Sequence, residues 1–378
     1  TIYIYFLLVV FCDSYVVPTS LIVILRESRG KTVVCYTPRM KKLALKIRPQ
    51  RTTQYTDMTE KLAAPELLAS PLGTAIKQID PVTLTGQGYL LVTVDEESIV
   101  PPCPALVDIL PRLGATSEAY EFFERIGEIE GPFLRPLETA FTPFVPLEMA
   151  EVRRYKGKTN EVFTRVLLNI AIFAGAYSNQ CTGRLRVLDP LAGGGTTLFL
   201  ALAAGYDAFG IEQQRQDVET TGVFVRQYLH SQRIPCKELD ERGRRAGRRY
   251  QFEIGHKGST RELVLAHGDA SKADRHMQEV PGGPHMHAIV ADLPYGIQHF
   301  GEIAGMLNKA LPVWERMLLP GGTIALAWNA THVERSALVE SLERHSHLRV
   351  CNDPPYTQLT HTVDRVIKKR DIVVAVKT

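Results

Sequence analysis

Four acidic residues from the middle of the chain onward follow short apolar runs, either directly or within three positions: Asp189, Glu212, Asp269 and Asp292. Apolar runs of this length, bounded by glycine or polar residues, predict buried strands of a parallel sheet. The carboxyl ends of parallel strands meet at one edge of a sheet, and ligands bind at that edge. We therefore expect the four carboxylates to lie close together and to accept hydrogen bonds from a ligand.

The first of these acids begins a glycine-rich turn. Residues 189–197 read Asp-Pro-Leu-Ala-Gly-Gly-Gly-Thr-Thr, and residues 198–204 after them predict a helix. A strand, a glycine turn and a helix N-terminus receive nucleotide-like ligands, and the glycines let the backbone approach the ligand closely. No lysine follows the glycines and their spacing differs from the dinucleotide fingerprint, so the turn is not a P-loop. Asp189 would repel a phosphate and suits a ligand that carries an amine or a sulfonium.

Two later segments extend this pattern. Glu212 lies about twenty residues after the glycine turn, the offset at which an acid accepts hydrogen bonds from ribose hydroxyls. The apolar run 286–291 ends in Asp292-Leu293-Pro294-Tyr295-Gly296. This loop and the glycine turn together resemble the catalytic loop and the S-adenosylmethionine loop of amino-methyltransferases. The resemblance is closest to RNA methylases that modify exocyclic amines of tRNA or rRNA bases, particularly the guanine-N2 group often fused to THUMP domains.

The resemblance covers roughly residues 145–378 and implies a doubly wound, Rossmann-like α/β methyltransferase sheet that binds S-adenosylmethionine. In the family, the turn before the apolar-periodic helix expected over 162–173 closes over the methionine end of the cofactor. That placement brings Lys158, Thr159 and Asn160 near the sulfonium; the alternative is that Thr159 or Asn160 only caps the helix. An acid matching Asp269 binds the adenine amino group. The cofactor-binding residues expected in this way are Thr159, Asn160, Asp189, Ala192, Gly193, Gly195, Thr196, Thr197, Glu212, Asp269 and Ala270.

The loop at Asp292 would supply the catalytic residues. An exocyclic base amine is a poor nucleophile because its lone pair is conjugated into the ring. The Asp292 carboxylate and the Leu293 carbonyl could hold its nitrogen in line with the methyl group and stabilise the positive charge that develops on it. Pro294 stiffens the turn, and Tyr295 offers a face for a base extruded from its helix. The alternative is an ordinary turn at the end of a strand.

A second motif competes with this loop. Asp353-Pro354-Pro355-Tyr356 matches the catalytic pattern of DNA amino-methyltransferases letter for letter. It precedes a basic stretch and the terminal strand, so we expect a structural turn away from the cofactor. Two alternatives to RNA methylation remain. An enzyme of the same fold could methylate adenine N6 or cytosine N4 in DNA, or the chain could be an RNA-binding protein whose methylase domain is inactive.

The composition adds weaker constraints. The chain has 378 residues, a net charge of +3 and 45% apolar residues, as expected of a globular protein with two domains. Its six cysteines are scattered without a C-x-x-C pair, and its histidines lack metal-site spacing. These features predict no metal and a reducing, cytoplasmic location. Five arginines within residues 242–249 favour contact with RNA phosphates, the alternative being a solvated loop.

The first 140 residues are the least informative. We expect an apolar segment over 1–30, an accessory α+β domain over 31–140, to which the resemblance gives an RNA-binding role, and the methyltransferase domain over 141–378. Asp13 and Pro18 interrupt the apolar segment, which disfavours a membrane span. Within the accessory domain, residues 89–94 predict a strand, and residues 117–126 predict a short helix capped by Ser117. No THUMP-like pattern is evident there, and the alternative is a domain that only packs against the catalytic one.

Overall fold

The computed structural model describes residues 21–27, 30–36, 40–50, 56–139, 141–239, 249–294, 300–363 and 369–378. The apolar residues 1–20, four of the five clustered arginines and Tyr295 lie outside the described residues. The first two described strands of the chain, β1 (Leu21–Glu27) and β2 (Gly30–Tyr36), pair antiparallel with each other. Within the described part of the chain, no helix has both the length and the apolar character needed to cross a membrane.

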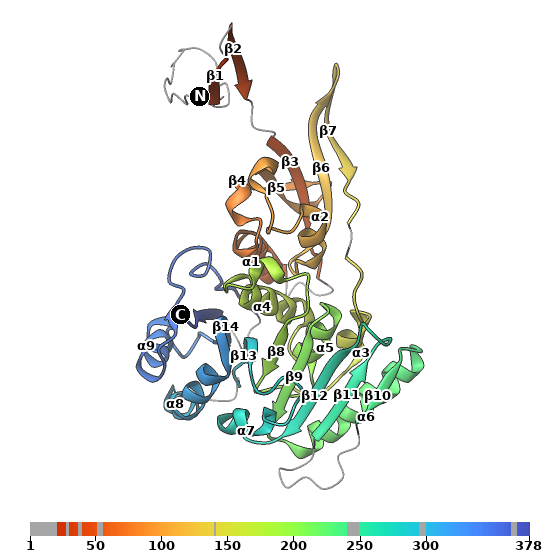
Figure 1. The fold of residues 1–378 in the computed structure, drawn as a ribbon, viewed down its shortest axis with the longest axis vertical. Helices are drawn as coiled ribbons and strands as arrows, with labels where there is room; N and C mark the ends of the chain where they lie inside the picture. Colours follow the sequence, from red (N-terminus) through yellow and green to blue (C-terminus); the bar gives the residue numbers. More distant parts are fainter. Residues whose placement is uncertain are drawn as a thin grey trace.

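A nine-stranded sheet forms the larger part of the molecule (Figure 1). Its five central strands are parallel: β12 (Arg261–His267), β9 (Asp207–Glu212), β8 (Arg186–Asp189), β13 (Met286–Asp292) and β14 (Leu318–Asn329). Antiparallel strands flank them, with β11 (Arg249–Ile254) and β10 (Cys236–Glu238) at one edge and β16 (Arg370–Val376) and β15 (Arg349–Val350) at the other. The strands predicted before Asp189, Glu212, Asp269 and Asp292 are confirmed as β8, β9, β12 and β13.

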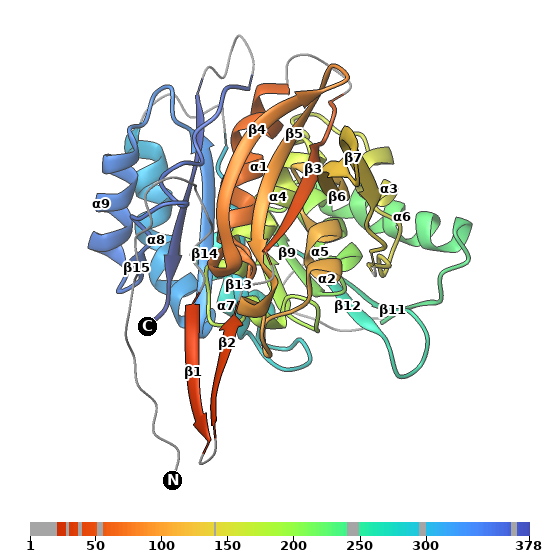
Figure 2. The ribbon, with the colours of Figure 1, turned by 90° about the horizontal axis from the view of Figure 1, so that it is seen from above.

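Helices cover both faces of this sheet, as Figure 2 shows from above. One core contains buried residues of α4 (Glu161–Phe173), α5 (Thr196–Ala203) and α6 (Arg215–Ser231). The other contains those of α7 (Ala273–Met277), α8 (Phe300–Met317) and α9 (Arg335–His345). Successive strand residues alternate between the cores, Val187 in the first and Leu188 in the second. The doubly wound α/β class is therefore confirmed.

The strand order places a crevice beside β8. The chain passes from β8 outward through β9 to β12 on one side, and β13 and β14 lie on the other side. The direction of winding thus reverses between β8 and β13, and ligands bind at such a switch point outside the carboxyl ends of the strands. Asp189 is the last residue of β8, and Asp292 is the last residue of β13.

The N-terminal sheet is antiparallel, in the order β4 (Ile76–Leu84), β5 (Gln87–Asp95), β3 (Met40–Ile47), β6 (Thr116–Ile126) and β7 (Ile129–Pro136). The strand predicted at 89–94 is confirmed as part of β5. The helix predicted at 117–126 is wrong, because those residues form β6 and pair with strands on both sides. Aromatic residues such as Tyr120, Phe122 and Phe123 suit such a half-buried pleated surface better than a helix.

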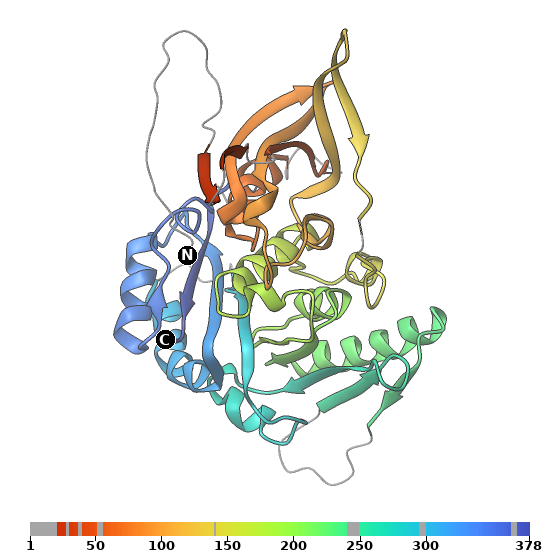
Figure 3. The same cartoon turned by 45° about the horizontal axis from the view of Figure 1, so that its top comes forward.

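The two sheets are joined by α1 (Thr56–Ala69), which packs on α4 below the N-terminal sheet (Figures 1 and 3). Buried Glu66 accepts hydrogen bonds from the amides of Gly114 and Ala115 at 2.8 and 2.9 Å and from Asn169 Nδ2 of α4 at 2.7 Å. These bonds satisfy a carboxylate that would otherwise be costly to bury. The division expected near residue 140 lies between β7 and α3 (Glu148–Val152), and it stays a prediction.

Candidate active site

A cavity of about 480 Å³ lies at the switch point, within the size range of small-molecule sites. All four strand-end acids line it, from four different elements of the sheet edge. The structure also brings most of the other predicted site residues to this cavity: Thr159, Ala192, Gly193, Thr196, Thr197, Ala270, Leu293 and Pro294. Gly195 and Asn160 do not line it. Tyr295 lies outside the described residues, so its expected role in stacking on the base stays a prediction.

Asp189 lines the cavity and is 3% exposed. Burial is the main reason that its pKa is raised to about 7, and the nearby carboxylates of Asp292 and Glu212 raise it further. Hydrogen bonds from the Thr197 hydroxyl and from the Leu191 amide, at 2.9 Å, oppose that rise. A positively charged ligand group placed beside Asp189 would favour its carboxylate form.

Glu212 connects the end of β9 to the glycine turn. Its Oε2 accepts a hydrogen bond from the Gly193 amide at 2.9 Å, and its Oε1 accepts one from the Gln214 amide at 2.6 Å. A carboxylate offers about four acceptor positions, so Glu212 can also bind ligand hydroxyls. The two backbone contacts hold the side chain toward the cavity.

The three glycines of the turn are needed for different reasons. Gly193 and Gly195 have φ of +50° and +92°, a region that favours glycine. A Cβ on Gly194 would lie only 2.4 Å from the ring of Tyr155, and one on Gly195 would lie 3.0 Å from Phe199. Gly194 therefore makes room for a protein side chain, where the sequence had suggested close approach to a ligand. Gly195 caps α5 from outside the cavity.

Tyr155 is a site residue that the sequence reasoning missed. It covers the glycine turn, lines the cavity and shares a 2.8 Å hydrogen bond with the Thr196 hydroxyl. Thr196 is the first residue of α5, so this bond ties Tyr155 to the start of that helix. The available signal was an aromatic residue within the basic run just before the turn at 158–160.

Asp269 caps a short 3-10 helix at the end of β12 (residues 270–272). Its Oδ1 accepts bonds from the Ser271 amide and hydroxyl at 2.9 and 2.8 Å, which lower the pKa of Asp269. The Ala270 carbonyl accepts a 2.9 Å bond from the indole of Trp314. The main chain on this side of the cavity is therefore firmly placed. The expected contact between Asp269 and an adenine amino group stays a prediction.

Asp292 ends β13 on the opposite side of the cavity, with a side chain that is 18% exposed. Thr159 Oγ1 donates a hydrogen bond to its Oδ2 at 2.6 Å, and Arg370 Nη2 lies 2.5 Å from the same oxygen. Burial raises the pKa of Asp292 above its ordinary value, and Arg370 and Thr159 offset only part of that rise. Thr159 thus reaches the predicted catalytic carboxylate, and Arg370 is a second contact that the sequence reasoning missed.

Lys158 and Asn160 lie elsewhere than expected. Asn160 is the N-cap of α4, as the capping alternative predicted, and its Oδ1 accepts the Phe163 amide at 3.1 Å. Lys158 Nζ donates to the Glu151 carbonyl at 2.9 Å and pairs with Glu161. Neither lines the cavity at the switch point, because their side chains are used in capping and pairing on the other side of the 155–160 turn.

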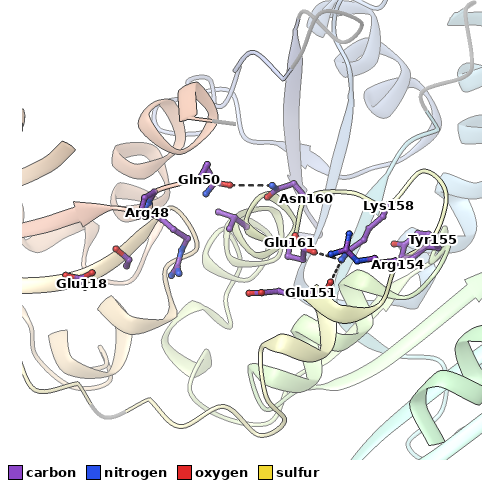
Figure 4. Close-up of a pocket in the computed structure, with 12 residues that line it drawn as sticks. Arg48, Gln50, Glu118, Glu151, Arg154, Tyr155, Lys158, Asn160 and Glu161 are labelled. Atoms are coloured by element: carbon purple, nitrogen blue, oxygen red, sulfur yellow. Dashed lines mark hydrogen bonds and ion pairs between the residues drawn. The ribbon is translucent and has the colours of Figure 1, made fainter. Parts of the chain in front are cut away.

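These two residues line a second cavity of about 620 Å³, between the N-terminal sheet and residues 151–162 (Figure 4). Tyr155 lines both cavities. The second cavity is polar, with three cationic and three acidic side chains: Arg48, Arg154 and Lys158, and Glu118, Glu151 and Glu161. The guanidinium of Arg48 is held by the carbonyls of Gly114 and Thr116, both at 2.7 Å.

The competing Asp-Pro-Pro-Tyr motif forms a turn between β15 and β16 and does not line the switch-point cavity. Asp353 is exposed, and the Tyr356 carbonyl accepts a 3.1 Å bond from Arg335. The predicted structural turn is confirmed. Among the described residues, no group of three or more histidine, cysteine or acidic side chains is arranged to hold a metal ion.

Comparison with known proteins gives likeness in fold only. No protein-family model and no curated protein matches the chain. Among solved structures, it is similar to TrmN from Thermus thermophilus, with a TM-score of 0.42 and 15% identity over 90% of this chain and 100% of that one. It is also similar to a precorrin-6y C5,15-methyltransferase from Geobacter metallireducens (TM-score 0.34, 16% identity, 60% and 95% covered). A third is an rRNA methylase from Streptococcus thermophilus (TM-score 0.31, 14% identity, 51% and 88% covered).

Proposed function

We propose that this protein transfers a methyl group from S-adenosylmethionine to an exocyclic amine of a nucleobase in RNA, with guanine N2 of tRNA as the favoured acceptor. The observation that carries the proposal is the meeting of four strand-end carboxylates around one cavity at the switch point. A phosphate ligand would not suit such a site. A ligand with ribose hydroxyls, amino groups and a positive charge would.

The donor fits the residues present. Glu212 would bind the ribose hydroxyls, Asp269 the adenine amino group, and Asp189 the positively charged methionine end. Burial and the neighbouring carboxylates raise the pKa of Asp189 to about 7, so this group is suited to a cationic partner. S-adenosylmethionine, when bound, supplies a methyl group on an electrophilic sulfonium.

The residues on the other side of the cavity would hold the acceptor. Asp292 and the Leu293 carbonyl accept hydrogen bonds from the amine and aim its nitrogen lone pair at the methyl carbon. With the donor bound, the methyl group would pass to nitrogen as its bond to sulfur breaks, and the electron pair of that bond would stay on sulfur. The Asp292 carboxylate would stabilise the positive charge that grows on nitrogen and would accept the proton that the amine releases. Pro294 keeps the loop in place.

The second cavity supports an RNA acceptor. It lies between the N-terminal sheet and the turn that carries Thr159, and Tyr155 forms a wall common to both cavities. A strand whose target base enters the first cavity would lay its neighbouring nucleotide across the second, where Arg48 and the exposed Arg154 can meet phosphates. The described cysteines are free thiols, which fits the reducing cytoplasm as the proposed location.

The proposal is tested by paired aspartate variants. Asp292→Ala should abolish methyl transfer to RNA and leave S-adenosylmethionine binding intact, because the carboxylate serves the acceptor. Asp353→Ala, in the competing motif, is the matched control and should behave like the wild type. Transfer of labelled methyl and calorimetric cofactor binding are measured on all three proteins. Normal turnover by Asp292→Ala, or loss of turnover by Asp353→Ala, would contradict the proposal.

A further inference from the structure

Asp292 is held by a strand that the mechanism above does not use. Arg370 is the first residue of β16, and its Nη2 lies 2.5 Å from Asp292 Oδ2. The Arg370 side chain is only 4% exposed, so the ion pair is shielded from solvent. Breaking a shielded pair by removing one partner is strongly unfavourable, because the other charge remains buried. This pair therefore constrains the protonation and the orientation of Asp292.

Three elements fix the guanidinium in place. The backbone of Arg370 exchanges two 2.9 Å hydrogen bonds with His361. Its guanidinium carbon lies 3.6 Å from the centre of the Phe163 ring of α4, within cation–π range. That ring lies 5.1 Å from the ring of His361. The guanidinium is thus placed by β16, by α4 and by the segment before β16.

We propose that Arg370 is a positioning residue that, together with Thr159, keeps Asp292 ionised and in one orientation for the acceptor amine. The inference rests on the proposed methyl transfer to an amine. Both donors approach Oδ2, and a carboxylate offers about four acceptor positions over its two oxygens. A carboxylate oriented before the acceptor arrives does not have to reorganise during the reaction, which is how fixed polar groups accelerate it.

The charges around Asp292 explain why a cation is needed there. Burial raises the pKa of Asp292, and the nearby carboxyl group of Asp189 on β8 has its own pKa raised by Asp292. Tyr155 also faces Asp292, and His361 and Arg370 are the cationic or potentially cationic groups beside it. Without Arg370, Asp292 would be protonated at a higher pH. A protonated carboxyl group would lose acceptor capacity for the amine.

The test compares Arg370→Met with Arg370→Lys, which keeps the charge. Turnover by Arg370→Met should fall by about 100-fold, the effect of misplacing a reacting group. The acid limb of its kcat–pH profile should move to higher pH by about 1–3 units, because the opposite charge that lowers the pKa of Asp292 is gone. Arg370→Lys should keep the acid limb close to that of the wild type. S-adenosylmethionine binding should be retained in both variants.

The matched control is Arg335→Met, which removes the cation of another partly buried ion pair at β16, 3.1 Å from Asp371. It should lower thermal stability and leave the pH profile unchanged. If Arg370→Met does not fold, Thr159→Val gives the same readout through the second donor, with a smaller upward shift. A pH profile that is unchanged in the Arg370 and Thr159 variants would overturn the inference, as would a uniform loss of turnover at all pH values.

A readout without activity separates this inference from the proposed function. The Asp292 carboxyl is titrated by carbon NMR in the ligand-free protein, with Asp292→Asn to assign its signal. Its midpoint should rise in Arg370→Met and stay near the wild-type value in Arg370→Lys. If the midpoint rises but the wild type transfers no methyl group, the proposed function fails while the Arg370 contact holds. An unchanged midpoint would overturn the role of Arg370.

Discussion

The two sides of the switch-point cavity are built in different ways. On the side of β8, β9 and β12, each carboxylate accepts a bond from the backbone amide two positions later: Asp189 from Leu191, Glu212 from Gln214 and Asp269 from Ser271. Glu212 also accepts one from the Gly193 amide, 19 positions earlier. On the side of β13, Asp292 is held by two side chains: Thr159 from the turn before α4, and Arg370 from β16. The first side is local in sequence, and the second is assembled by the fold.

This difference separates two kinds of function. Local backbone contacts fix the shape of a binding site as soon as the strand and turn form, so the first side is suited to holding a ligand in place. The second side depends on the packing of α4, β13 and β16. Variants on the first side should therefore change cofactor affinity, and variants on the second side should change turnover and its pH dependence.

The largest expected effect on the first side comes from Gly194→Ala. The new Cβ would lie 2.4 Å from the Tyr155 ring, so Tyr155 must move and its bond to Thr196 is lost. Overpacking of this kind costs about 1–3 kcal/mol, and calorimetry should show S-adenosylmethionine affinity reduced by up to about 100-fold. Gly305→Ala is the control, since a Cβ there meets no atom within 4 Å. Equal S-adenosylmethionine affinity in both variants would show that Tyr155 does not contribute to cofactor binding.

The next effect is a pH dependence of cofactor binding set by Asp189. Its pKa is raised to about 7, so it is mostly protonated below that pH and mostly ionised above it. A cationic ligand prefers the ionised form, so affinity should increase about tenfold from pH 6 to pH 8 and level off. Asp189→Asn should bind weakly with a flat profile, and Asp353→Asn should keep the wild-type profile. Affinity that falls as the pH rises would contradict a cationic group beside Asp189.

The smallest effect is expected for Glu212→Gln. The amide side chain can accept from only one of the Gly193 and Gln214 amides and points an NH2 group at the other. Leaving one such bond unmade costs about 1–3 kcal/mol, and partial relaxation of the loop should keep the affinity loss at the lower end, about fivefold. Glu128→Gln, at the exposed β6–β7 turn, should have no effect. A pH-dependent fall in turnover without loss of cofactor affinity would contradict this prediction, because it would show that Glu212 acts on the acceptor and not in cofactor binding.

The same difference explains what could be read from the sequence. Asp189, Glu212 and Asp292 were found because each ends an apolar strand, a pattern that lies within a few residues. Arg370 could not be found this way, because only the antiparallel pairing of β16 with β14 brings it beside β13. The strand β6 was mistaken for a helix because its partners, β3 and β7, decide its conformation more than its own residues do.

The most direct test is nucleoside mass spectrometry after total RNA and total DNA are incubated with the protein and methyl-labelled S-adenosylmethionine. We expect label in RNA on an exocyclic amine, as N2-methylguanosine in the tRNA fraction, and none in Asp292→Ala reactions. Label in DNA on adenine N6 or cytosine N4 would contradict the RNA acceptor. Label on carbon or on a ribose hydroxyl, or no label with either nucleic acid, would contradict the central claim that Asp292 directs methyl transfer to a base amine.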